Sequence, residues 1–543
     1  MTFMKIKNIV YQLAGLAFAT CPLAIVGCAD WDDHYEGTDD AAGAGNVTLW
    51  QQMKADSRLT DFCEVLENTK VFRQHKKTPV SYAELLDGGQ AFTVVAPVNG
   101  TFDKDELIRL TQTNSGDSVV EKSFVMNHVS RSLCSVTAAQ SKMLLLNSKH
   151  VEMEGNGISG VDLLDKNVHA KNGILHVSEQ PLPFVRNIYE NVCDLDEFSD
   201  IGDFLRVYDE DYFDADASVS SGIVEGVPVY VDSVIIERNK MLSVIGLIND
   251  EDSTYWMVAP TRDGWNKAWE MAKQYYRYDS KVLKSDSIQH YWTNRALLDD
   301  AIFTMTTQES VTDSLKSVQY NKLEPKYHVF YKPFEQGGIL SNATEVECSN
   351  GILYKTAEWP FTPETTFFTE LRSEGEDQAL ITVSKDCNYT TRRMSADSIS
   401  EGAYLDIVAL KATSNWTMTY RVNNTLSAKY DVCAVILPKS VADKVNPDLR
   451  PCKFKATINY VDELGNKKTF NCGNTQFKTD PLKVDTVVLA ENFEFPACNF
   501  DQQDIKISVQ LTCSILPREN SEYNREMYLD CIYLRPRTSK SEE

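Results

Sequence analysis

Two stretches decide the fold: residues 92–102 read FTVVAPVNGTF, and residues 255–265 read YWMVAPTRDGW. In each stretch a run of residues with high strand propensity stops at Ala-Pro, because proline donates no amide hydrogen bond to a strand ladder. The residues after the proline can cap a helix: Asn99 in the first stretch, and Thr261 or Asp263 in the second. Each stretch therefore predicts a strand, a turn and then a helix.

A second landmark follows each of these stretches. Residues 172–177 read NGILHV, and residues 350–354 read NGILY. In both, Asn-Gly supplies a turn with positive φ and the apolar residues after it begin a strand, so the landmark predicts a hairpin. Two landmarks that recur in the same order indicate a duplicated fold. Pro97 precedes Asn172 by 75 residues and Pro260 precedes Asn350 by 90, so the second copy holds an insertion.

The first copy, residues 47–186, resembles the fasciclin domain. This domain is a β-wedge with helices packed on it, and it occurs in cell-adhesion and matrix proteins and in many bacterial surface proteins. The resemblance rests on the two landmarks and on Asn127-His128-Val129 between them. Two residues depart from the family pattern, Val95 and Val98, where phenylalanine and threonine are common. The resemblance implies that residues 47–186 form a fasciclin-like domain.

The second copy, residues 190–371, diverges further from the same family. It keeps Val-Ala-Pro-Thr and Asn-Gly-Ile-Leu, but Arg262 replaces the asparagine and Tyr354 replaces the histidine of the first copy. We expect a divergent fasciclin-like domain here.

The last third of the chain, residues 374–540, follows a period of two residues. Apolar residues alternate with polar ones in at least seven runs, as in residues 453–460 and 505–513. This pattern places one face of each strand in a core and the other in water. It predicts an antiparallel β-sandwich of the jelly-roll kind, an architecture broadly similar to carbohydrate-binding modules. The predicted fold class of the whole chain is therefore α+β.

The amino terminus has the pattern of a bacterial lipoprotein leader, residues 1–27. Two lysines precede an uncharged stretch, Leu13 to Val26, which is too short to span a bilayer comfortably. Ile25-Val26-Gly27-Cys28 resembles a lipobox, which implies cleavage before Cys28 and acylation of that residue as the lipid anchor. Residues 28–46 then form a flexible tether, and an apolar first helix of a cytoplasmic protein is the alternative.

The acidic residues that follow Cys28 bear on localisation. Ala29-Asp30-Trp31-Asp32-Asp33 resembles a surface-export signal of certain Gram-negative lineages, which implies an outer-membrane lipoprotein that faces the cell exterior. In enterobacteria-like systems, an aspartate two places after the cysteine implies retention in the inner membrane instead.

Charge, motifs and cysteine spacing limit the partners and reactions that this chain can have. The formal net charge of -24 excludes nucleic acid as a ready partner. No nucleophile-elbow, zinc-protease or phosphate-loop motif is present, so we expect no enzyme and no cofactor, although 78 acidic residues leave a glycosidase pair open. The chain has 13 cysteines, two of them at positions 21 and 28. The other eleven show no metal-ligand spacing, which favours no metal site and leaves buried thiols or disulfides as alternatives.

Several residues invite a functional interpretation that the sequence does not favour. His128 and His176 lie among apolar neighbours, so hydrogen-bonded core histidines are expected rather than catalytic or metal sites. Trp416 and Tyr420 share the buried face of a strand. The remaining aromatic set is expected to fill the second domain and its seam with neighbours: Trp256, Trp265, Trp269, Tyr275, Tyr276, Tyr291 and Trp292. An acidic run is expected to be a solvated loop, with calcium binding as the alternative: Asp209, Glu210, Asp211, Asp214 and Asp216.

These observations predict a non-catalytic surface lipoprotein that binds a glycan or a partner protein. By analogy with accessory subunits of glycan-uptake systems, we expect it beside a TonB-dependent outer-membrane importer. The alternative is an adhesin that contacts host matrix or other cells through its fasciclin-like domains. The sequence assigns no ligand-binding residue.

Overall fold

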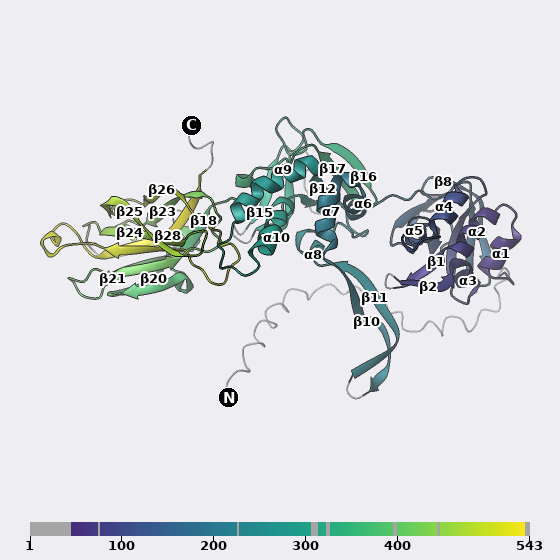
Figure 1. Cartoon of the computed structure of the whole chain (residues 1–543), viewed down its shortest axis with the longest axis horizontal. Helices are drawn as coiled ribbons and strands as arrows, with labels where there is room; N and C mark the ends of the chain where they lie inside the picture. The colour runs from purple at the N-terminus through teal and green to yellow at the C-terminus, as the bar shows by residue number, and fades with distance from the viewer. Residues whose placement is uncertain are drawn as a thin grey trace. The chain divides into compact units, whose positions relative to one another are not determined.

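The computed structural model describes residues 45–73, 76–224, 227–305, 313–321, 326–394, 399–441 and 446–537, which divide into two compact units (Figure 1). The first unit ends at Leu182, and the second begins at Pro183 and also takes in residues 73–76 and 148–150. The predicted leader and most of the tether lie outside the described residues. No helix in the described ranges has the length and apolar character needed to cross a bilayer.

The first unit combines five α-helices with a seven-stranded sheet. The helices are α1 (Leu49–Ala55), α2 (Thr60–Asn68), α3 (Tyr82–Asp87), α4 (Lys104–Leu110) and α5 (Asn114–Val120). The sheet runs in the order β4 (Val129–Ser130), β3 (Phe92–Pro97), β9 (Gly173–Ser178), β8 (Val161–Ala170), β7 (Gly157–Ile158), β6 (His150–Glu154) and β5 (Ser141–Leu144). A separate hairpin consists of β1 (Lys70–Arg73) and β2 (Lys76–Ser81).

The predicted strand at residues 92–97 is the centre of this unit. All six residues of β3 are buried, and β3 pairs in parallel with β9 and antiparallel with β4. Val94 packs with Phe62 and Leu66 of α2 and with Val125 in one hydrophobic core. The Ala-Pro stop acts as expected, because β3 ends at Pro97. The predicted cap is wrong: Asp103, not Asn99, caps the helix that follows, and the Asn99 side chain instead accepts the amide of Asp61 in α2 at 2.9 Å.

The first part of the second unit has the same plan. Its helices are α6 (Ile188–Asp194), α7 (Ser199–Arg206), α8 (Leu242–Ile245), α9 (Arg262–Lys273) and α10 (Ser285–Leu298). Its six-stranded sheet runs in the order β15 (Lys326–Tyr331), β14 (Ser314–Asn321), β13 (Ile302–Thr304), β12 (Tyr255–Pro260), β17 (Gly351–Thr356) and β16 (Thr344–Cys348). β12 pairs in parallel with β17 as β3 does with β9, so the predicted duplication is confirmed.

The asparagine of each Asn-Gly landmark holds its copy together. Asn172 accepts the amide of Leu49 at the start of α1 at 2.7 Å and donates to the carbonyls of Leu86 and Gly88. Asn350 accepts the amide of Ile188 at the start of α6 at 3.0 Å and donates to two carbonyls in the same way. Each buried asparagine therefore ties a sheet to the first helix of its copy.

The glycine after each asparagine is required by close backbone approach. Gly173 and Gly351 have φ of 154° and 143°, and each is the first residue of its strand rather than a turn residue. A Cβ at either position would clash with a carbonyl oxygen, that of Phe92 or Tyr255 respectively. The predicted hairpins are present, but their turns consist of the asparagine and the residue before it.

The acidic run at residues 209–216 lies in a strand, so the predicted loop is wrong. β10 (Asp209–Val224) pairs antiparallel with β11 (Val227–Asn239). Arg238 of the opposite strand and Lys240 directly after it supply cations that stabilise this acidic strand, because Glu210 pairs with Arg238 at 2.6 Å and with Lys240. The side chains of Asp214 and Asp216 lie outside the described residues.

The last part of the second unit is a sandwich of two antiparallel sheets. One runs in the order β20 (Cys387–Arg393), β21 (Ala403–Ala409), β28 (Glu526–Pro536), β23 (Lys429–Ile436) and β26 (Asp485–Glu494), and β18 (Leu371–Glu374) also pairs with β28. The other runs in the order β19 (Ile381–Lys385), β22 (Thr417–Arg421), β27 (Ser508–Cys513), β24 (Lys453–Val461) and β25 (Lys467–Lys478).

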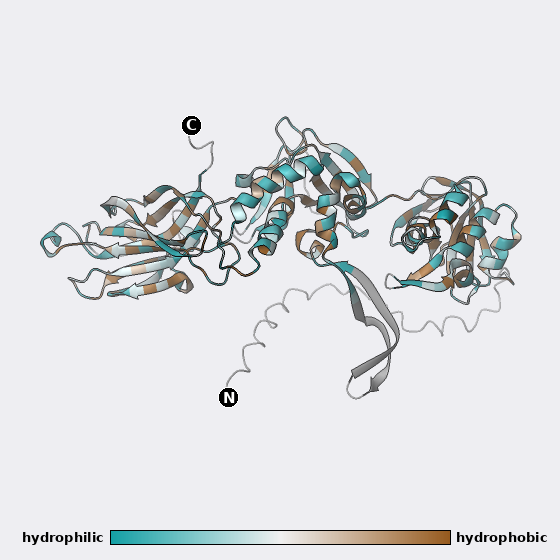
Figure 2. Cartoon of the chain, in the orientation of Figure 1, coloured by the Kyte–Doolittle hydropathy of each residue, from teal (hydrophilic) through white to brown (hydrophobic). Residues whose placement is uncertain are grey.

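The alternation of apolar and polar residues that predicted the sandwich is visible along its strands (Figure 2). Trp416 and Tyr420 are fully buried in its core, as expected. The structure is therefore α+β, with two copies of a helix-covered sheet followed by a β-sandwich. The boundaries at residues 186, 190, 371 and 374 stay predictions.

Candidate ligand-binding site

The second unit has a hollow of about 480 Å³ between helices α7, α9 and α10. Its volume lies within the ~300–1,000 Å³ typical of small-ligand sites. Rings, carboxylates and a few other side chains line it: Phe204, Tyr208, Trp265, Trp269 and His290; Asp200, Asp203 and Glu270; Val207, Asn266 and Asn294.

Helical spacing brings these side chains together. Residues three or four apart lie on one face of an α-helix, so each of the three helices presents a row to the hollow. The rows are 200, 203 and 204 of α7, continued by 207 directly after it; 265 with 269, and 266 with 270, of α9; and 290 with 294 of α10. The rows are visible in the sequence, but only the fold shows that they face one another.

The aromatic rings at the hollow differ in how far they are exposed. Trp265 is 2% exposed and belongs to the core beneath the hollow, whereas Trp269 is half-buried. The ring centroids of Trp269 and His290 lie 5.9 Å apart, and those of Phe204 and Tyr208 lie 5.3 Å apart. His290 also lies 6.1 Å from Phe204. These rings therefore form one connected apolar surface at the hollow.

The carboxylates of the hollow differ in how far they are neutralised. Asp200 lies 3.2 Å from the Nε atom of Arg262. The side chain of Asp203 is 77% exposed and lies 3.8 Å from an Arg206 nitrogen, a weak surface pair. Glu270 is exposed. Asp203 and Glu270 are therefore available to accept hydrogen bonds from a ligand.

This arrangement suits a ligand with an apolar face and hydroxyl donors. Rings bind an apolar face through dispersion and area burial, and carboxylates accept hydrogen bonds from hydroxyl groups. Burial, together with the nearby Tyr291, raises the pKa of Tyr208, so its hydroxyl remains a donor at neutral pH. The hollow therefore offers both stacking surface and hydrogen-bond partners.

Most of the predicted core aromatics are where the sequence placed them. Trp265 and Tyr276 are 2% exposed, and Tyr276 belongs to the core of the sandwich, which confirms a packed seam. Four others pack against the cores of the second unit: Trp256, Tyr275, Tyr291 and Trp292. Trp269 also packs against the core of the second unit, and it differs from these four in that it lines the hollow as well.

The two histidines of the fasciclin-like landmarks are core residues. His128 is 1% exposed, donates from Nδ1 to the carbonyl of Phe124 at 2.7 Å and accepts the amide of Leu182 at Nε2. Burial lowers its pKa to about 4. His176 is fully buried, and its Nε2 lies 3.0 Å from the carbonyl oxygen of Cys134. Both rings are neutral and structural.

Sequence reasoning missed a carboxylate cluster in the sandwich. Ser400 donates its amide to Asp530 at 3.0 Å and its hydroxyl to Glu374 at 2.8 Å. One buried oxygen of Glu374 and one of Glu376 have no hydrogen-bond partner among the described residues. Burial, with the neighbouring acids, raises the pKa of Glu374 to about 7 and that of Asp530 to about 6. This cluster therefore holds protons near neutral pH.

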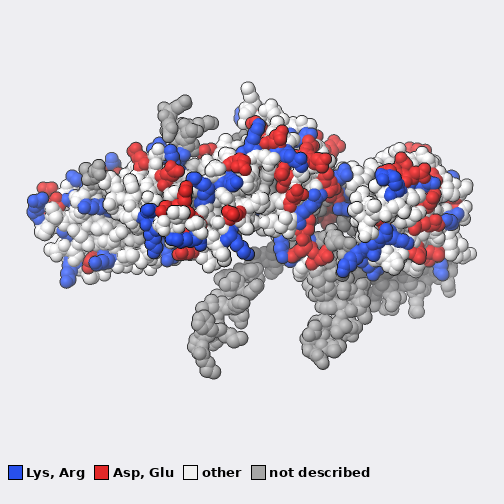
Figure 3. All heavy atoms as spheres, in the orientation of Figure 1, with Lys and Arg blue, Asp and Glu red and all other residues white. Residues whose placement is uncertain are grey.

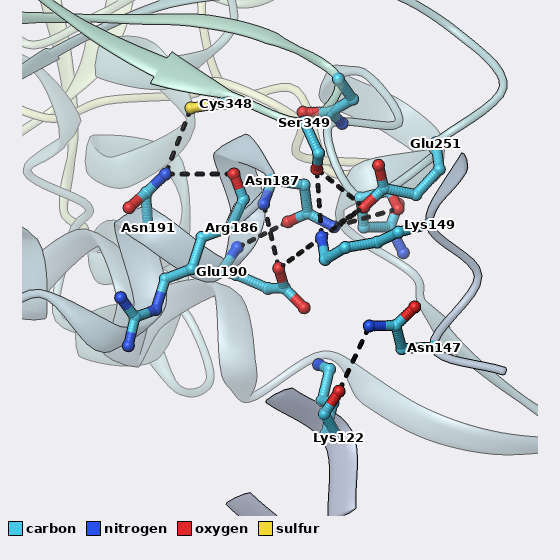
Figure 4. Close-up of polar contacts among 12 residues, drawn as sticks. Lys122, Asn147, Lys149, Arg186, Asn187, Glu190, Asn191, Glu251, Cys348 and Ser349 are labelled. Atoms are coloured by element: carbon cyan, nitrogen blue, oxygen red, sulfur yellow. Dashed lines mark hydrogen bonds and ion pairs between the residues drawn. The ribbon is translucent and has the colours of Figure 1, made fainter. Parts of the chain in front are cut away.

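A second buried polar cluster surrounds the start of α6 (Figure 4). The ammonium of Lys149 lies 3.0 Å from Glu190 and 2.8 Å from Glu251, and it donates to the Ser349 hydroxyl at 3.0 Å. Asn187 caps the helix by accepting the amide of Glu190 at 2.8 Å. The contacts balance a buried lysine with two carboxylates, which is a structural arrangement.

The described side chains show how the potential metal ligands and the cysteines are arranged. No group of three or more His, Cys, Asp or Glu residues within the described ranges is arranged to hold a metal ion. The eleven cysteines in those ranges are free thiols, and most of them are buried. Cys28, the predicted lipid anchor, lies outside the described residues.

Comparison with known proteins places parts of the chain beside two kinds of solved structure. No family model and no curated protein match the chain. The C-terminal family 22 carbohydrate-binding module of Clostridium thermocellum Xyn10B is similar at 10% identity, 30% of this chain, 92% of that chain and a TM-score of 0.20. A family 11 carbohydrate-binding module from Clostridium thermocellum, in complex with a mixed-linked tetrasaccharide, is similar at 11% identity, 31% and 95% coverage and a TM-score of 0.20.

The other kind is a FAS1 domain pair from the insect cell adhesion molecule Fasciclin I. It is similar at 11% identity, over 51% of this chain and 90% of that chain, with a TM-score of 0.18. Each likeness concerns the fold of part of the chain only.

Proposed function

We propose that this chain is a glycan-binding protein and that the hollow between α7, α9 and α10 is its binding site. The observation that carries the proposal is the set of partly exposed rings beside unneutralised carboxylates in one hollow. Sugars combine an apolar C–H face with many hydroxyl donors, so a glycan needs both kinds of partner at once.

Within this site the rings and the polar side chains have separate tasks. Trp269 and Tyr208 stack on sugar faces, and His290 extends that surface. Asp203 and Glu270 accept hydroxyl hydrogen bonds and so fix the orientation of the sugar. Rings give most of the affinity and the carboxylates give most of the selectivity.

The proposal extends to where the protein acts. Acyl chains on Cys28 hold the protein in the outer membrane, with its body outside the cell. There it serves as a non-catalytic accessory subunit of a TonB-dependent importer that takes up the bound glycan. Support for this part comes from the sequence of the leader and from the acidic stretch after it.

Affinity electrophoresis of the purified full chain in gels containing single polysaccharides tests glycan binding. We expect at least one polysaccharide to retard the protein, and Trp269→Ala to weaken that binding about tenfold, since a lost stacking contact costs about 1.4 kcal/mol. Glu270→Gln, at an exposed position, tests whether the hollow is the binding site without disturbing the core.

The matched control is Tyr331→Ala, which removes a ring that is 75% exposed on β15, outside the lining of the hollow. Retardation should persist in this variant. The proposal fails if no polysaccharide retards the parent chain, or if Trp269→Ala and Tyr331→Ala behave alike.

A second candidate function, adhesion through protein contacts, is favoured by exposed tyrosines on β14 and β15. Tyr320 and Tyr327 are 42% and 43% exposed, with ring centroids 5.1 Å apart, and Tyr331 is more exposed still. Tyrosine is enriched at protein interfaces. Cells that carry Tyr331→Ala should then adhere less to matrix proteins while polysaccharide binding is unchanged; equal adherence removes this candidate.

A further inference from the structure

The hollow has an excess of negative charge. Its lining includes three carboxylates and no lysine or arginine. Arg262, outside the lining, neutralises Asp200, but Asp203 has only a 3.8 Å surface pair. Within the described residues no ion pair is recorded for Glu270. A ligand that enters the hollow therefore meets two carboxylates, Asp203 and Glu270, that have no close ion-pair partner among the described residues. On the face shown in Figure 3, both acidic and basic side chains are exposed.

The ring of Trp269 already attracts a cation. The ammonium of Lys273, one turn further along α9, lies 4.7 Å from the centroid of the Trp269 ring. An ammonium within about 6 Å of an indole face is attracted by the negative charge of the ring face. Lys273 therefore occupies a position that a ligand ammonium can take, with Glu270 beside Trp269 in the same helix.

We propose that the hollow binds amine-bearing glycans, such as those with glucosamine units. This inference rests on the proposed function and names its ligand class. The ligand ammonium displaces Lys273 from Trp269 and pairs with Glu270 and Asp203. The sugar rings stack on Trp269 and Tyr208, as in the proposed function. Glycans with uronate or sulfate groups are repelled, because like charges would be buried together.

Isothermal titration of the full chain with three oligosaccharides tests this. The amine form is a chitosan oligosaccharide, the uncharged form is the same oligosaccharide after N-acetylation, and the acidic form is an oligogalacturonide. At a mildly acidic pH, where the sugar amine is protonated, we expect the amine form to bind about tenfold more tightly than the acetylated form. The difference should shrink in high salt, and the acidic form should not bind.

Two variants isolate the charge effect. Glu270→Gln should lower affinity for the amine form about tenfold and leave the acetylated form nearly unchanged. Lys273→Met should raise affinity for the amine form several-fold, since it removes the resident cation. The control is Glu335→Gln, because the Glu335 carboxylate is also exposed but lies outside the lining of the hollow; it should change neither affinity.

The outcomes separate this inference from the function on which it rests. Equal affinity for the amine and acetylated forms overturns the inference while glycan binding stands. Tighter binding of a lysine-rich peptide than of the amino sugar also overturns it. Failure of every glycan to bind overturns the proposed function itself.

Discussion

Glu121 illustrates how burial sets the chemistry of a single residue. It is 6% exposed, accepts the Phe72 amide at 2.8 Å and the Tyr82 hydroxyl at 2.9 Å, and lies near Asp117. Burial raises its pKa to about 7, from an ordinary value of 4.5. The folded state therefore keeps a proton that the unfolded state releases. This contribution to stability is present below pH 4.5 and is lost as the pH rises from about 4.5 to about 7.

Glu121→Gln removes this titration while keeping an acceptor oxygen for both donors. We expect the variant to be more stable than the parent chain above about pH 7 by roughly 1–2 kcal/mol, a value reduced for solvent screening, and equally stable near pH 4. Calorimetric unfolding of the full chain at several pH values, with EDTA present to remove divalent cations, measures the difference.

The control is Glu84→Gln, for which we expect a change in stability of the opposite sign. Hydrogen bonds from Ser81 in the capping box of α3 lower the pKa of Glu84. Its contribution is present above its ordinary pKa and is lost as the pH falls, so Glu84→Gln should lose stability at neutral pH and little in acid. If both variants shift stability in the same direction at neutral pH, the argument from burial is wrong.

The roles of single residues could be predicted from the sequence only where the residues that they contact are close in sequence. The core roles of His128 and His176 follow from apolar residues beside them. Glu121 could not be assigned, because its partners Phe72 and Tyr82 lie 49 and 39 residues away. The carboxylate cluster of Glu374 and Asp530 depends on two paired strands, β18 and β28, that are more than 150 residues apart in the sequence, so no local pattern indicates it.

At the scale of elements, the asparagine that recurs in both copies connects several segments of its copy through one side chain. Asn350 is 3% exposed and makes three hydrogen bonds to backbone groups at the start of α6 and after α8. Removal of its amide leaves those groups buried without their partner.

Asn350→Ala should therefore lower the free energy of unfolding of the second unit by about 2–4 kcal/mol. Asn172→Ala should do the same in the first unit, because it makes the same three contacts. Thermal unfolding followed by circular dichroism measures both. Asn342→Ala, at an exposed position, serves as the control, and a loss no greater than in this variant would refute the assigned role.

Strands and helices could be predicted from the sequence where one spacing of apolar residues, or one clear stop signal, dominates. Strict alternation found the strands of the sandwich, and the Ala-Pro stop found β3 and β12. The acidic run was misread because the cations that stabilise β10 belong to β11, more than twenty residues away. The hollow was missed because α7 and α9 are ordinary amphipathic helices and α10 shows no apolar stripe at all. The convergence of the three helices is a property of tertiary packing.

At the scale of the whole molecule, the chain joins a strongly acidic body to an amino terminus, residues 1–27, that has two lysines and no acidic residue. The body would be repelled by anionic surfaces, so electrostatic attraction cannot hold it at a membrane of anionic lipids. Stable attachment then depends on acyl chains, and more than one chain is needed because a single one gives only marginal binding. In the proposed function, glycan capture at the cell surface depends on Cys28 as much as on the hollow.

Cys28→Ser should leave the leader uncut and abolish incorporation of a labelled fatty acid, because serine offers no thiol for the diacylglyceryl group. The electrophoretic mobility of the chain and the label in the purified protein measure these two effects. Cys21→Ser is the matched control, since it removes the other cysteine of the leader and should leave both unchanged. Labelling of Cys28→Ser equal to that of the parent contradicts the anchor. Complete protection of the parent chain from protease added to intact cells contradicts display on the cell exterior, even if the label is present.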